Sequence, residues 1–215
     1  MGVQQSRIRV DLSSQSARTP YLNSRLWLRE TSKVHADASN FASGVSKREA
    51  YEQVLEQARA LFVGQRNWVP ELTQLDGSNL ANAASLLWHC YHSLPNPSSA
   101  VNWAGFYVLD RTQQNQLILG PFMGKVACQT IAFGRGVCGK AAEEGKTVRV
   151  QDVDSFPGHI ACDGDSQSEV VVPIVQNGKV MAIIDIDCAM KDGFDQEDQN
   201  ALEELAALLS EACDF

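Results

Sequence analysis

The sequence predicts an α+β domain in which helices pack on a face of one antiparallel sheet. Residues 46–93 place apolar side chains with a helical period. Residues 103–187 instead hold short apolar and aromatic runs separated by turn residues, as strands do. A helical period returns after Asp195. Helices first, strands next and a final helix, without a βαβ alternation, are typical of this fold class.

The first helix begins at Ser46, which forms a capping box with Glu49, and it ends at Gly64. Its inward face holds Ala50, Val54, Leu55, Ala58, Leu61 and Phe62. We expect Asn79 to cap a second helix that stops before Pro95. The inward face of this helix holds Leu80, Ala83, Ala84, Leu87, Trp88 and Tyr91.

The strands follow in a meander that is interrupted once. Their predicted ranges are 103–109, 116–122, 128–133, 148–150, 169–175 and 179–187. The last two flank Asn177-Gly178, which is a strong hairpin signal. A short helix over 137–144 separates the third strand from the fourth, and a long polar loop over 152–166 separates the fourth strand from the hairpin. In the final helix, Leu202, Leu205, Ala206, Leu209 and Ala212 should face the core.

Composition limits the choice of partners. The chain has 215 residues, 44% of them hydrophobic, which is enough to build a core. A formal net charge of -8 disfavours a phosphate-binding surface, so we expect no nucleic acid partner. No apolar run approaches the roughly 20 residues that span a bilayer, so we expect no membrane association through a spanning helix.

Residues 1–44 differ in kind from the domain that we expect over 45–215. Residues 1–34 hold six basic and two acidic residues and show no sustained period, which predicts a disordered basic extension. Such a composition also resembles a mitochondrial transit peptide, and Met1-Gly2 through Ser6 fit the N-myristoylation pattern. We expect a cytoplasmic protein, and the extension leaves a mitochondrial or lipid-anchored form open.

The six cysteines suggest reactive thiols more than a structural framework. No secretory segment precedes them, so a reducing compartment is expected. No Cys-x-x-Cys pair or zinc spacing is present, so we expect no metal. Cys90, Cys188 and Cys213 lie in helices or at a strand end and should be buried. Cys162 lies in a polar loop, which packing explains poorly.

Two other cysteines stand in turns near that loop and could resolve an oxidised Cys162. These are Cys128 and Cys138. Cys138 lies at the start of a helix flanked by glycines, where the helix dipole favours a thiolate. His159, three residues before Cys162, is either a base for it or a brace for the loop.

Acidic residues form a second cluster. Asp185 and Asp187 alternate in an apolar strand, so both point to one face, and Glu169 begins the neighbouring strand. Two interpretations are open. The acids lie on an exposed strand end, or they line a pocket that binds a cation or keeps one carboxyl protonated.

Several motifs, taken together and in order, resemble one family. They are Asn102-Trp103-Ala104-Gly105-Phe106-Tyr107, Leu119-Gly120-Pro121-Phe122, Ala127-Cys128, Gly134-Arg135-Gly136-Val137-Cys138-Gly139, Gly158-His159-Ile160-Ala161-Cys162 and Asp185-Ile186-Asp187. Over residues 45–212 the chain resembles the free methionine-(R)-sulfoxide reductases, which are built on a GAF domain. The resemblance implies a six-stranded antiparallel sheet flanked by helices, with the substrate under loops. Residues 1–34 and a stretch near 70–77 depart from the family pattern.

The resemblance also implies roles for single residues. Cys162 matches the catalytic cysteine, Cys128 the principal resolving cysteine and Cys138 a third cysteine of the relay. The pocket residues that match are Trp103, Tyr107, Glu169, Asp185 and Asp187.

The implied reaction is reduction of free L-methionine (R)-S-oxide through a sulfenic acid and a disulfide. Thioredoxin is the expected external reductant, and no bound cofactor is expected. The alternative is a GAF module without catalysis, which senses a small ligand or the redox state. The sequence leaves a homodimer open.

Overall fold

The computed structural model describes residues 41–42, 44–64, 79–160 and 163–215. The chain divides into two units, residues 1–33 and 34–215, and the fold below is that of the second unit. Three sequence predictions therefore lie outside the described residues: the basic extension up to residue 40, the insertion near 70–77, and the position of Cys162.

Four helices and six strands form the described domain. The helices are α1 (Lys47–Phe62), α2 (Asn79–Ser93), α3 (Gly136–Glu144) and α4 (Gln196–Ala212), with short 3-10 helices at η1 (Ser98–Ala100) and η2 (Val153–Ser155). The strands are β1 (Val101–Leu109), β2 (Gln116–Gly124), β3 (Thr130–Ala132), β4 (Val148–Val150), β5 (Ser168–Gln176) and β6 (Lys179–Cys188).

The six strands form one sheet in the order β3-β2-β1-β6-β5-β4, and every neighbouring pair is antiparallel. The predicted α+β class and the six-stranded sheet are thus confirmed. Asn177 and Gly178 both have positive φ, as the predicted tight hairpin between β5 and β6 requires. β3 is shorter than predicted, so Cys128 lies before this strand, in the connection from β2.

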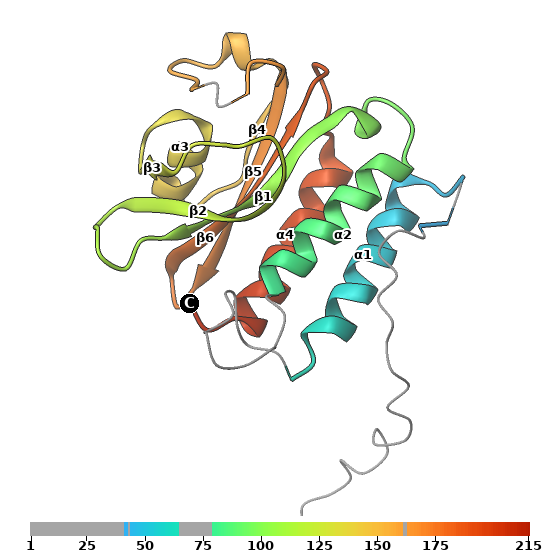
Figure 1. The fold of residues 1–215 in the computed structure, drawn as a ribbon, viewed down its shortest axis with the longest axis horizontal. Coiled ribbons are helices and arrows are strands. Elements are labelled where there is room, and N and C mark those ends of the chain that lie inside the picture. Colours follow the sequence, from blue (N-terminus) through green and yellow to red (C-terminus); the bar gives the residue numbers. More distant parts are fainter. Residues whose placement is uncertain (1–40, 43, 65–78, 161–162) are drawn as a thin grey trace, which may run out of the picture. The chain divides into compact units, whose positions relative to one another are not determined.

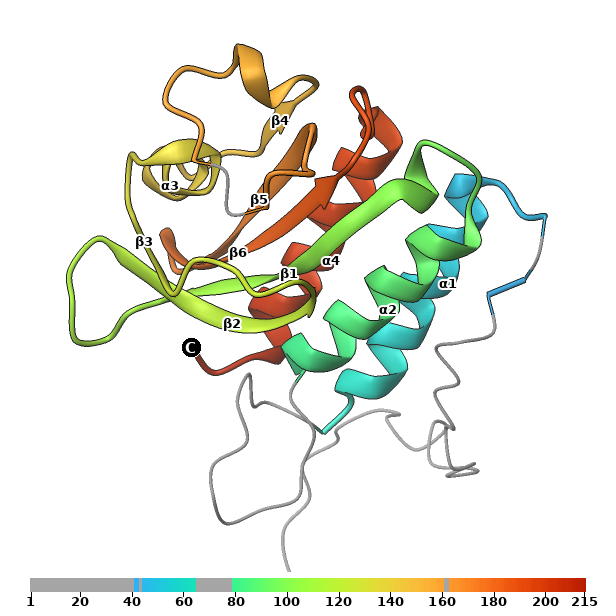
Figure 2. The same cartoon turned by 45° about the horizontal axis from the view of Figure 1, so that its top comes forward.

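Helices cover both faces of the sheet (Figures 1 and 2). α2 packs on β1 and β2, α4 packs on β5, and α1 lies on the outer side of α2 and α4. α3 lies on the opposite face, together with the loop between β4 and β5. Among the helices that the structure describes, none is long and apolar enough to cross a membrane.

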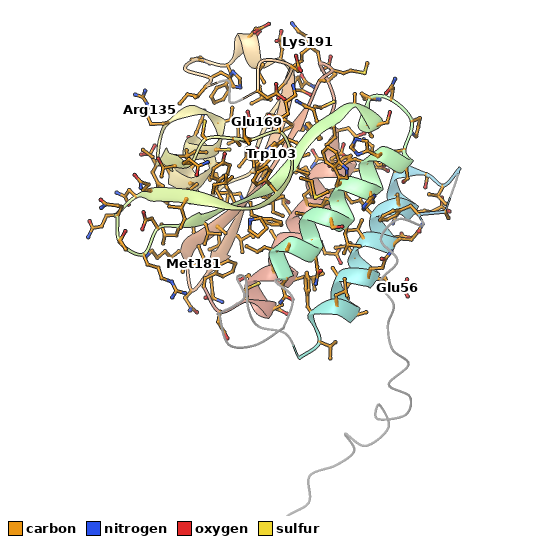
Figure 3. All side chains as sticks on the ribbon, in the orientation of Figure 1. Glu56, Trp103, Arg135, Glu169, Met181 and Lys191 are labelled. Carbon is orange, nitrogen blue, oxygen red and sulfur yellow. The ribbon has the colours of Figure 1, made fainter. Side chains whose placement is uncertain are left out.

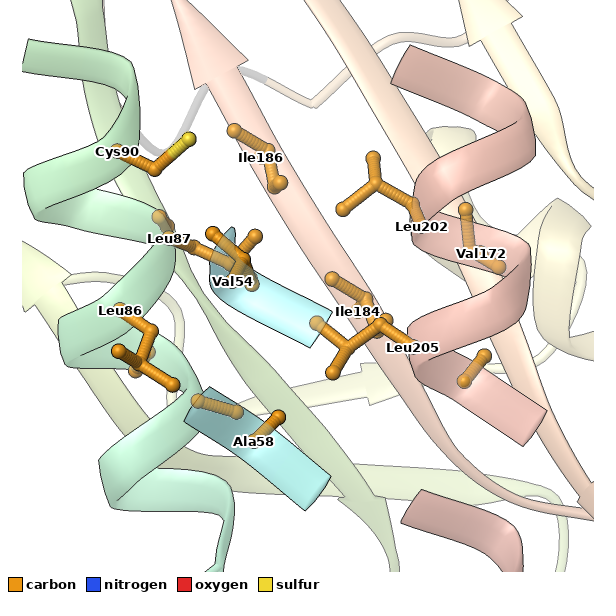
Figure 4. Packing of buried hydrophobic residues seen from close by; sticks show 14 of the residues in the cluster. Val54, Ala58, Leu86, Leu87, Cys90, Val172, Ile184, Ile186, Leu202 and Leu205 are labelled. Carbon is orange, nitrogen blue, oxygen red and sulfur yellow. The ribbon is translucent and has the colours of Figure 1, made fainter. Parts of the chain in front are cut away.

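The alternation of side chains along the strands separates two cores. In β1, Ala104 and Phe106 face the helices α1, α2 and α4, whereas Trp103 and Tyr107 face α3. In β6, Ile184 and Ile186 face the three helices in the same way. Figure 4 shows the larger core, where Ile184 and Ile186 meet Val54, Leu87, Cys90, Leu202 and Leu205. The sheet therefore offers its α3 face to a second, smaller set of side chains.

The helix predictions are confirmed with one correction. Ser46 and Glu49 form the expected capping box, and Asp195 caps α4. The prediction that Asn79 caps the second helix is wrong, because Asn79 is the first residue of α2 and its amide donates to the carbonyl of Ala212 (3.1 Å). Three further residues predicted to face the core do pack against it, although they are only partly buried: Leu61, Trp88 and Ala212.

Candidate active site

A pocket opens on the α3 face of the sheet. Its volume is about 330 Å³, and its walls come from β1, β5, β6, α3, the connection after β2 and the loop between β4 and β5. Figure 3 labels three of its lining residues, Trp103, Arg135 and Glu169. Seven of the eight predicted site residues line this pocket: Trp103, Tyr107, Cys128, Cys138, Glu169, Asp185 and Asp187. The eighth, Cys162, lies outside the described residues.

Aromatic rings form one wall. The ring of Trp103 stacks on that of Phe122, with 5.3 Å between centroids and 11° between planes, and on that of Tyr107 at 5.9 Å. The indole Nε1 of Trp103 donates to the carbonyl of Lys125 (3.1 Å), which fixes the ring. A side chain at Gly105 would meet Phe122 Cβ at 2.4 Å and the Trp103 ring at 2.8 Å, so the stack requires glycine there.

The acidic residues form the floor through strand register. Glu169 of β5 is the cross-strand partner of Asp187 in β6, and Asp187 is also the partner of Trp103 in β1. Asp185 lies two residues before Asp187 and therefore on the same face. Glu169 and Asp185 are only 6% and 5% exposed. Of the two interpretations that the sequence left open, the pocket is confirmed and the exposed strand end is wrong.

Burial raises the pKa of all three carboxyls above the ordinary range. For Asp185 the second cause is the charge of Glu169, and for Asp187 it is the charge of Asp185. The pKa of Glu169 is raised by burial and by Asp187, but a hydrogen bond with His159 lowers it. Glu169 is thus the member that most readily carries a charge, while the two aspartates favour the protonated form.

His159 joins the cluster from the loop. Its Nε2 lies 3.6 Å from Oε2 of Glu169, and the side chain of His159 is 14% exposed. The interaction with Glu169 raises the pKa of His159. The loop-brace interpretation of His159 is supported by this contact. The alternative, a base for Cys162, concerns a residue outside the described part of the chain.

Cys138 lies in the same cluster with a free, buried thiol. Its Sγ lies 3.5 Å from Oε1 of Glu169. The prediction that the helix dipole favours a thiolate at Cys138 is wrong, because burial, followed by the charges of Asp185 and Glu169, raises the pKa of this thiol. A helix terminus contributes only about 0.3–1 kcal/mol, and burial next to carboxylates outweighs it.

Cys128 is engaged in a disulfide bond, so the chain is described here in an oxidised state. It lies in the connection between β2 and β3 and lines the pocket. Cys90, Cys188 and Cys213 are buried, as predicted, and belong to the other core. Cys128 and Cys138 line the same pocket, and the disulfide at Cys128 is compatible with the resolving role expected of it.

The loop over the pocket is fastened by polar contacts that the sequence analysis missed. Asn102 of β1 donates to Asp163 (3.2 Å) and to Ser166 (3.0 Å). Lys125, after β2, forms ion pairs with Asp163 (3.2 Å) and Asp165 (2.6 Å). Both contacts join residues that are distant in sequence. In the sequence, only a polar Asn next to Trp103 and an Asp-rich loop pointed to these contacts.

The glycine-rich stretch before and inside α3 has a packing role. A side chain at Gly139 would meet the carbonyl of Ala132 at 2.3 Å, and the amide of Gly134 donates to the carbonyl of Gly139 (2.8 Å). These contacts let α3 approach the backbone of β3 closely. The approach brings Cys138 over the carboxylates of β5 and β6.

Comparison with known proteins agrees with this geometry. The family model described as "GAF domain" matches residues 81–214. The free methionine-R-sulfoxide reductase of Saccharomyces cerevisiae is 51% identical over 182 residues, which cover 84% of this chain and 95% of that protein.

Two solved structures have the same fold. A structure described as that of the GAF domain is 50% identical, with a TM-score of 0.77, and the match covers 87% of this chain and all of that one. The free methionine-R-sulfoxide reductase of Neisseria meningitidis, solved in complex with its substrate, is 38% identical, with a TM-score of 0.69. That match covers 79% of this chain and 92% of the other.

Proposed function

The chain belongs to the free methionine-R-sulfoxide reductases, a family built on the GAF domain, and we propose that it reduces free L-methionine (R)-S-oxide to L-methionine. One observation carries the proposal: a disulfide-bonded cysteine, Cys128, lines the same pocket as three carboxyl groups, of which those of Glu169 and Asp185 are buried. A sulfoxide reductase needs both, a thiol couple to supply electrons and acids to supply a proton.

In this proposal one carboxyl group binds the substrate and another supplies a proton. Glu169, whose charged form the hydrogen bond with His159 favours against the effect of burial, pairs with the ammonium group of the free amino acid. The ammonium also offsets negative charge that would oppose a thiolate nearby. The stack of Trp103 and Phe122 receives the thioether part of the side chain, since sulfur packs favourably against aromatic rings.

The chemical step begins at Cys162. Its thiolate attacks the sulfoxide, and the oxygen passes to the cysteine sulfur. The S–O bond of the substrate breaks, an S–O bond to Cys162 forms, and the oxygen takes up a proton, so methionine leaves and Cys162 becomes a sulfenic acid. Asp185, whose pKa burial raises, holds the proton that this step consumes. The sulfoxide sulfur is reduced by two electrons, and the cysteine sulfur is oxidised by two.

Resolution follows at Cys128. Its thiol condenses with the Cys162 sulfenic acid, which releases water and forms the disulfide. We propose Cys162 as the partner of the Cys128 disulfide, with Cys138 as a reserve resolving thiol. Thioredoxin reduces this disulfide by exchange and completes the cycle without a bound cofactor. A homodimer is compatible with the cycle, which needs one chain only.

We also propose the cytoplasm as the location, because the cycle depends on a reducing thiol pool. The basic extension, residues 1–34, provides the alternative of a mitochondrial or acylated form. Fractionation of cells that express the full chain, compared with a chain lacking residues 1–34, distinguishes the two.

An NADPH-coupled thioredoxin assay tests the function. We expect turnover of free L-methionine (R)-S-oxide and little turnover of the S epimer. Cys162→Ser serves as the inactive control, and Cys90→Ala as a control for thiol loss in the other core. Binding of the sulfoxide without turnover by the parent protein would instead support a ligand-sensing GAF module, and the reductase proposal would fail.

A further inference from the structure

Three donor groups on the floor of the pocket lie as close together as the ligands of a bound metal ion. The Sγ of Cys138 and one carboxylate oxygen each from Glu169 and Asp185 all lie within 4.8 Å of one another, and all three residues are buried. They come from α3, β5 and β6, so the packing of α3 on the sheet creates the group. In the proposed reaction these groups bind the ammonium, hold a proton and act as a reserve thiol, so a metal at this place would be an addition to that chemistry.

Asp185 supplies a second, independent indication of a ligand. Its Oδ1 is buried and has no hydrogen-bond partner among the described residues. A buried polar atom without a partner is costly, and most such atoms in proteins are satisfied by a neighbour, a water or an ion. The side chain is 5% exposed and lines the cavity, so whatever satisfies Oδ1 enters through the pocket.

We propose that Cys138, Glu169 and Asp185 form a binding site for a Zn²⁺ ion, which competes with the substrate. Zinc accepts thiolate and carboxylate ligands together in tetrahedral geometry, whereas Mg²⁺ and Ca²⁺ prefer six or more oxygens. Bond lengths of about 2.3 Å to sulfur and 2.0–2.2 Å to oxygen place tetrahedral S and O ligands about 3.6 Å apart. The observed distance from Cys138 Sγ to Glu169 Oε1 is 3.5 Å.

His159 supports the site without binding the metal itself. Its Nε2 contacts the second carboxylate oxygen of Glu169 at 3.6 Å, which orients Glu169 as outer-shell partners orient metal ligands. The fourth position of the metal faces the cavity and is open to water. Binding releases the proton of the Cys138 thiol to solvent, along with any proton on the two carboxyls.

The site has a consequence for regulation, and this part rests on the proposed function. The ion occupies the floor where the ammonium of free methionine sulfoxide would pair with Glu169. It also masks Cys138 while leaving the Cys128 disulfide untouched. Zinc and substrate therefore exclude each other.

The experiment uses the full chain in its disulfide form, in which Cys128 cannot bind a metal. Co²⁺ serves as a spectroscopic probe, and Zn²⁺ affinity is measured by displacement of Co²⁺. We expect one ion per chain and a thiolate-to-cobalt charge-transfer band. Cys138→Ser should abolish the band, and Cys90→Ala, a buried cysteine of the other core, should keep it. An unchanged band in Cys138→Ser would overturn the proposal.

Two further variants guard against a folding artefact. Asp185→Asn keeps the thiol and should weaken zinc binding, and His159→Gln, which alters only the outer shell, should weaken it by about tenfold. Circular dichroism confirms the fold of each variant. Equal zinc affinity in parent and Asp185→Asn, or displacement of zinc by equimolar Mg²⁺, would contradict the site.

Competition is measured on the same oxidised protein, which cannot turn over. Free L-methionine (R)-S-oxide should lower the cobalt band, and the N-acetylated compound should not. A band that is lost in Cys138→Ser but insensitive to free sulfoxide would overturn the competition. The two proposals can fail separately. If the protein binds the metal through Cys138 but has no reductase activity, the metal site is supported and the proposed function is refuted.

Discussion

Glu169 and Asp187 are direct cross-strand partners on one face of the β5–β6 ladder. Like charges in this position destabilise a sheet, and burial adds a desolvation cost. Asp185 shares the face two residues away, and neither core of the domain needs any of the three. The pair therefore lowers the stability of the fold, which is usual where residues serve the function of an active site.

Asp185→Asn should make the protein more stable at neutral pH. Burial raises the pKa of Asp185 in the folded chain above its unfolded value, so the folded state binds more protons between the two values, and stability falls as pH rises through that window. Asparagine does not ionise and avoids this loss. We expect a gain of about 1 kcal/mol, or roughly 2–4 °C in Tm.

The advantage of Asp185→Asn should vanish below about pH 4, where both states of the parent are protonated. Asp198→Asn is the matched control. Asp198 is buried as well, but it pairs with Lys47 (2.7 Å) and accepts a hydrogen bond from Tyr51 (2.8 Å), so its loss should lower the Tm. Thermal melts across pH check both, and a lower Tm for Asp185→Asn at neutral pH would contradict the account.

His159→Gln should change the pH dependence of catalysis. The hydrogen bond with His159 lowers the pKa of Glu169, so its loss lets that pKa rise, and Glu169 then takes up a proton at a higher pH. The acidic limb of the kcat/KM profile should move to higher pH. KM should rise more than kcat falls, since Glu169 binds the ammonium in this account.

His92→Gln is the control for His159→Gln, because His92 lies on α2 in the helical layer on the other face of the sheet. Its pH profile should match that of the parent. An acidic limb that stays in place in His159→Gln would show that His159 does not set the charge of Glu169.

The cysteine roles predict two different kinetic defects. Cys162→Ser should abolish methionine release, because no sulfenic acid forms. Cys128→Ser should release about one methionine per chain and then stall, because its sulfenic acid is resolved poorly. Quenched-flow measurement of methionine gives both numbers. Multiple turnover by Cys162→Ser would refute the assignment of the nucleophile.

Deletion of residues 1–34 should leave kcat/KM and Tm nearly unchanged. The segment has no apolar period with which to join a core. The coupled assay and a thermal melt check this. A large loss in either quantity would show that the segment contributes to the domain.

Local patterns were sufficient to predict most of the fold. Capping residues at Ser46 and Asp195 fixed two helix starts, and Asn177-Gly178 fixed the β5–β6 hairpin. Alternation in 185–187 placed both aspartates on one face. These signals act within a few residues, so a single sequence reveals them.

Contacts between distant segments could not be predicted in this way. The position of His159 on Glu169, the stack of Phe122 on Trp103 and the burial of the Cys138 thiol depend on how the loop and α3 settle on the sheet. The dipole argument at Cys138 failed for this reason, since it considered the helix alone. The capping prediction for Asn79 failed for a similar reason, because its side-chain amide donates a hydrogen bond to the carbonyl of Ala212 at the end of α4.

The most direct test of the acidic pocket compares kcat/KM for free L-methionine (R)-S-oxide with that for its N-acetylated form. A charge-assisted hydrogen bond contributes about 1.5–3 kcal/mol, so the free amino acid should be favoured by roughly one to two decades, with steric exclusion adding to this. Glu169→Gln and Asp187→Asn should lower kcat/KM for the free compound sharply and leave the fold intact. Comparable rates on the two compounds with the parent protein would contradict the account.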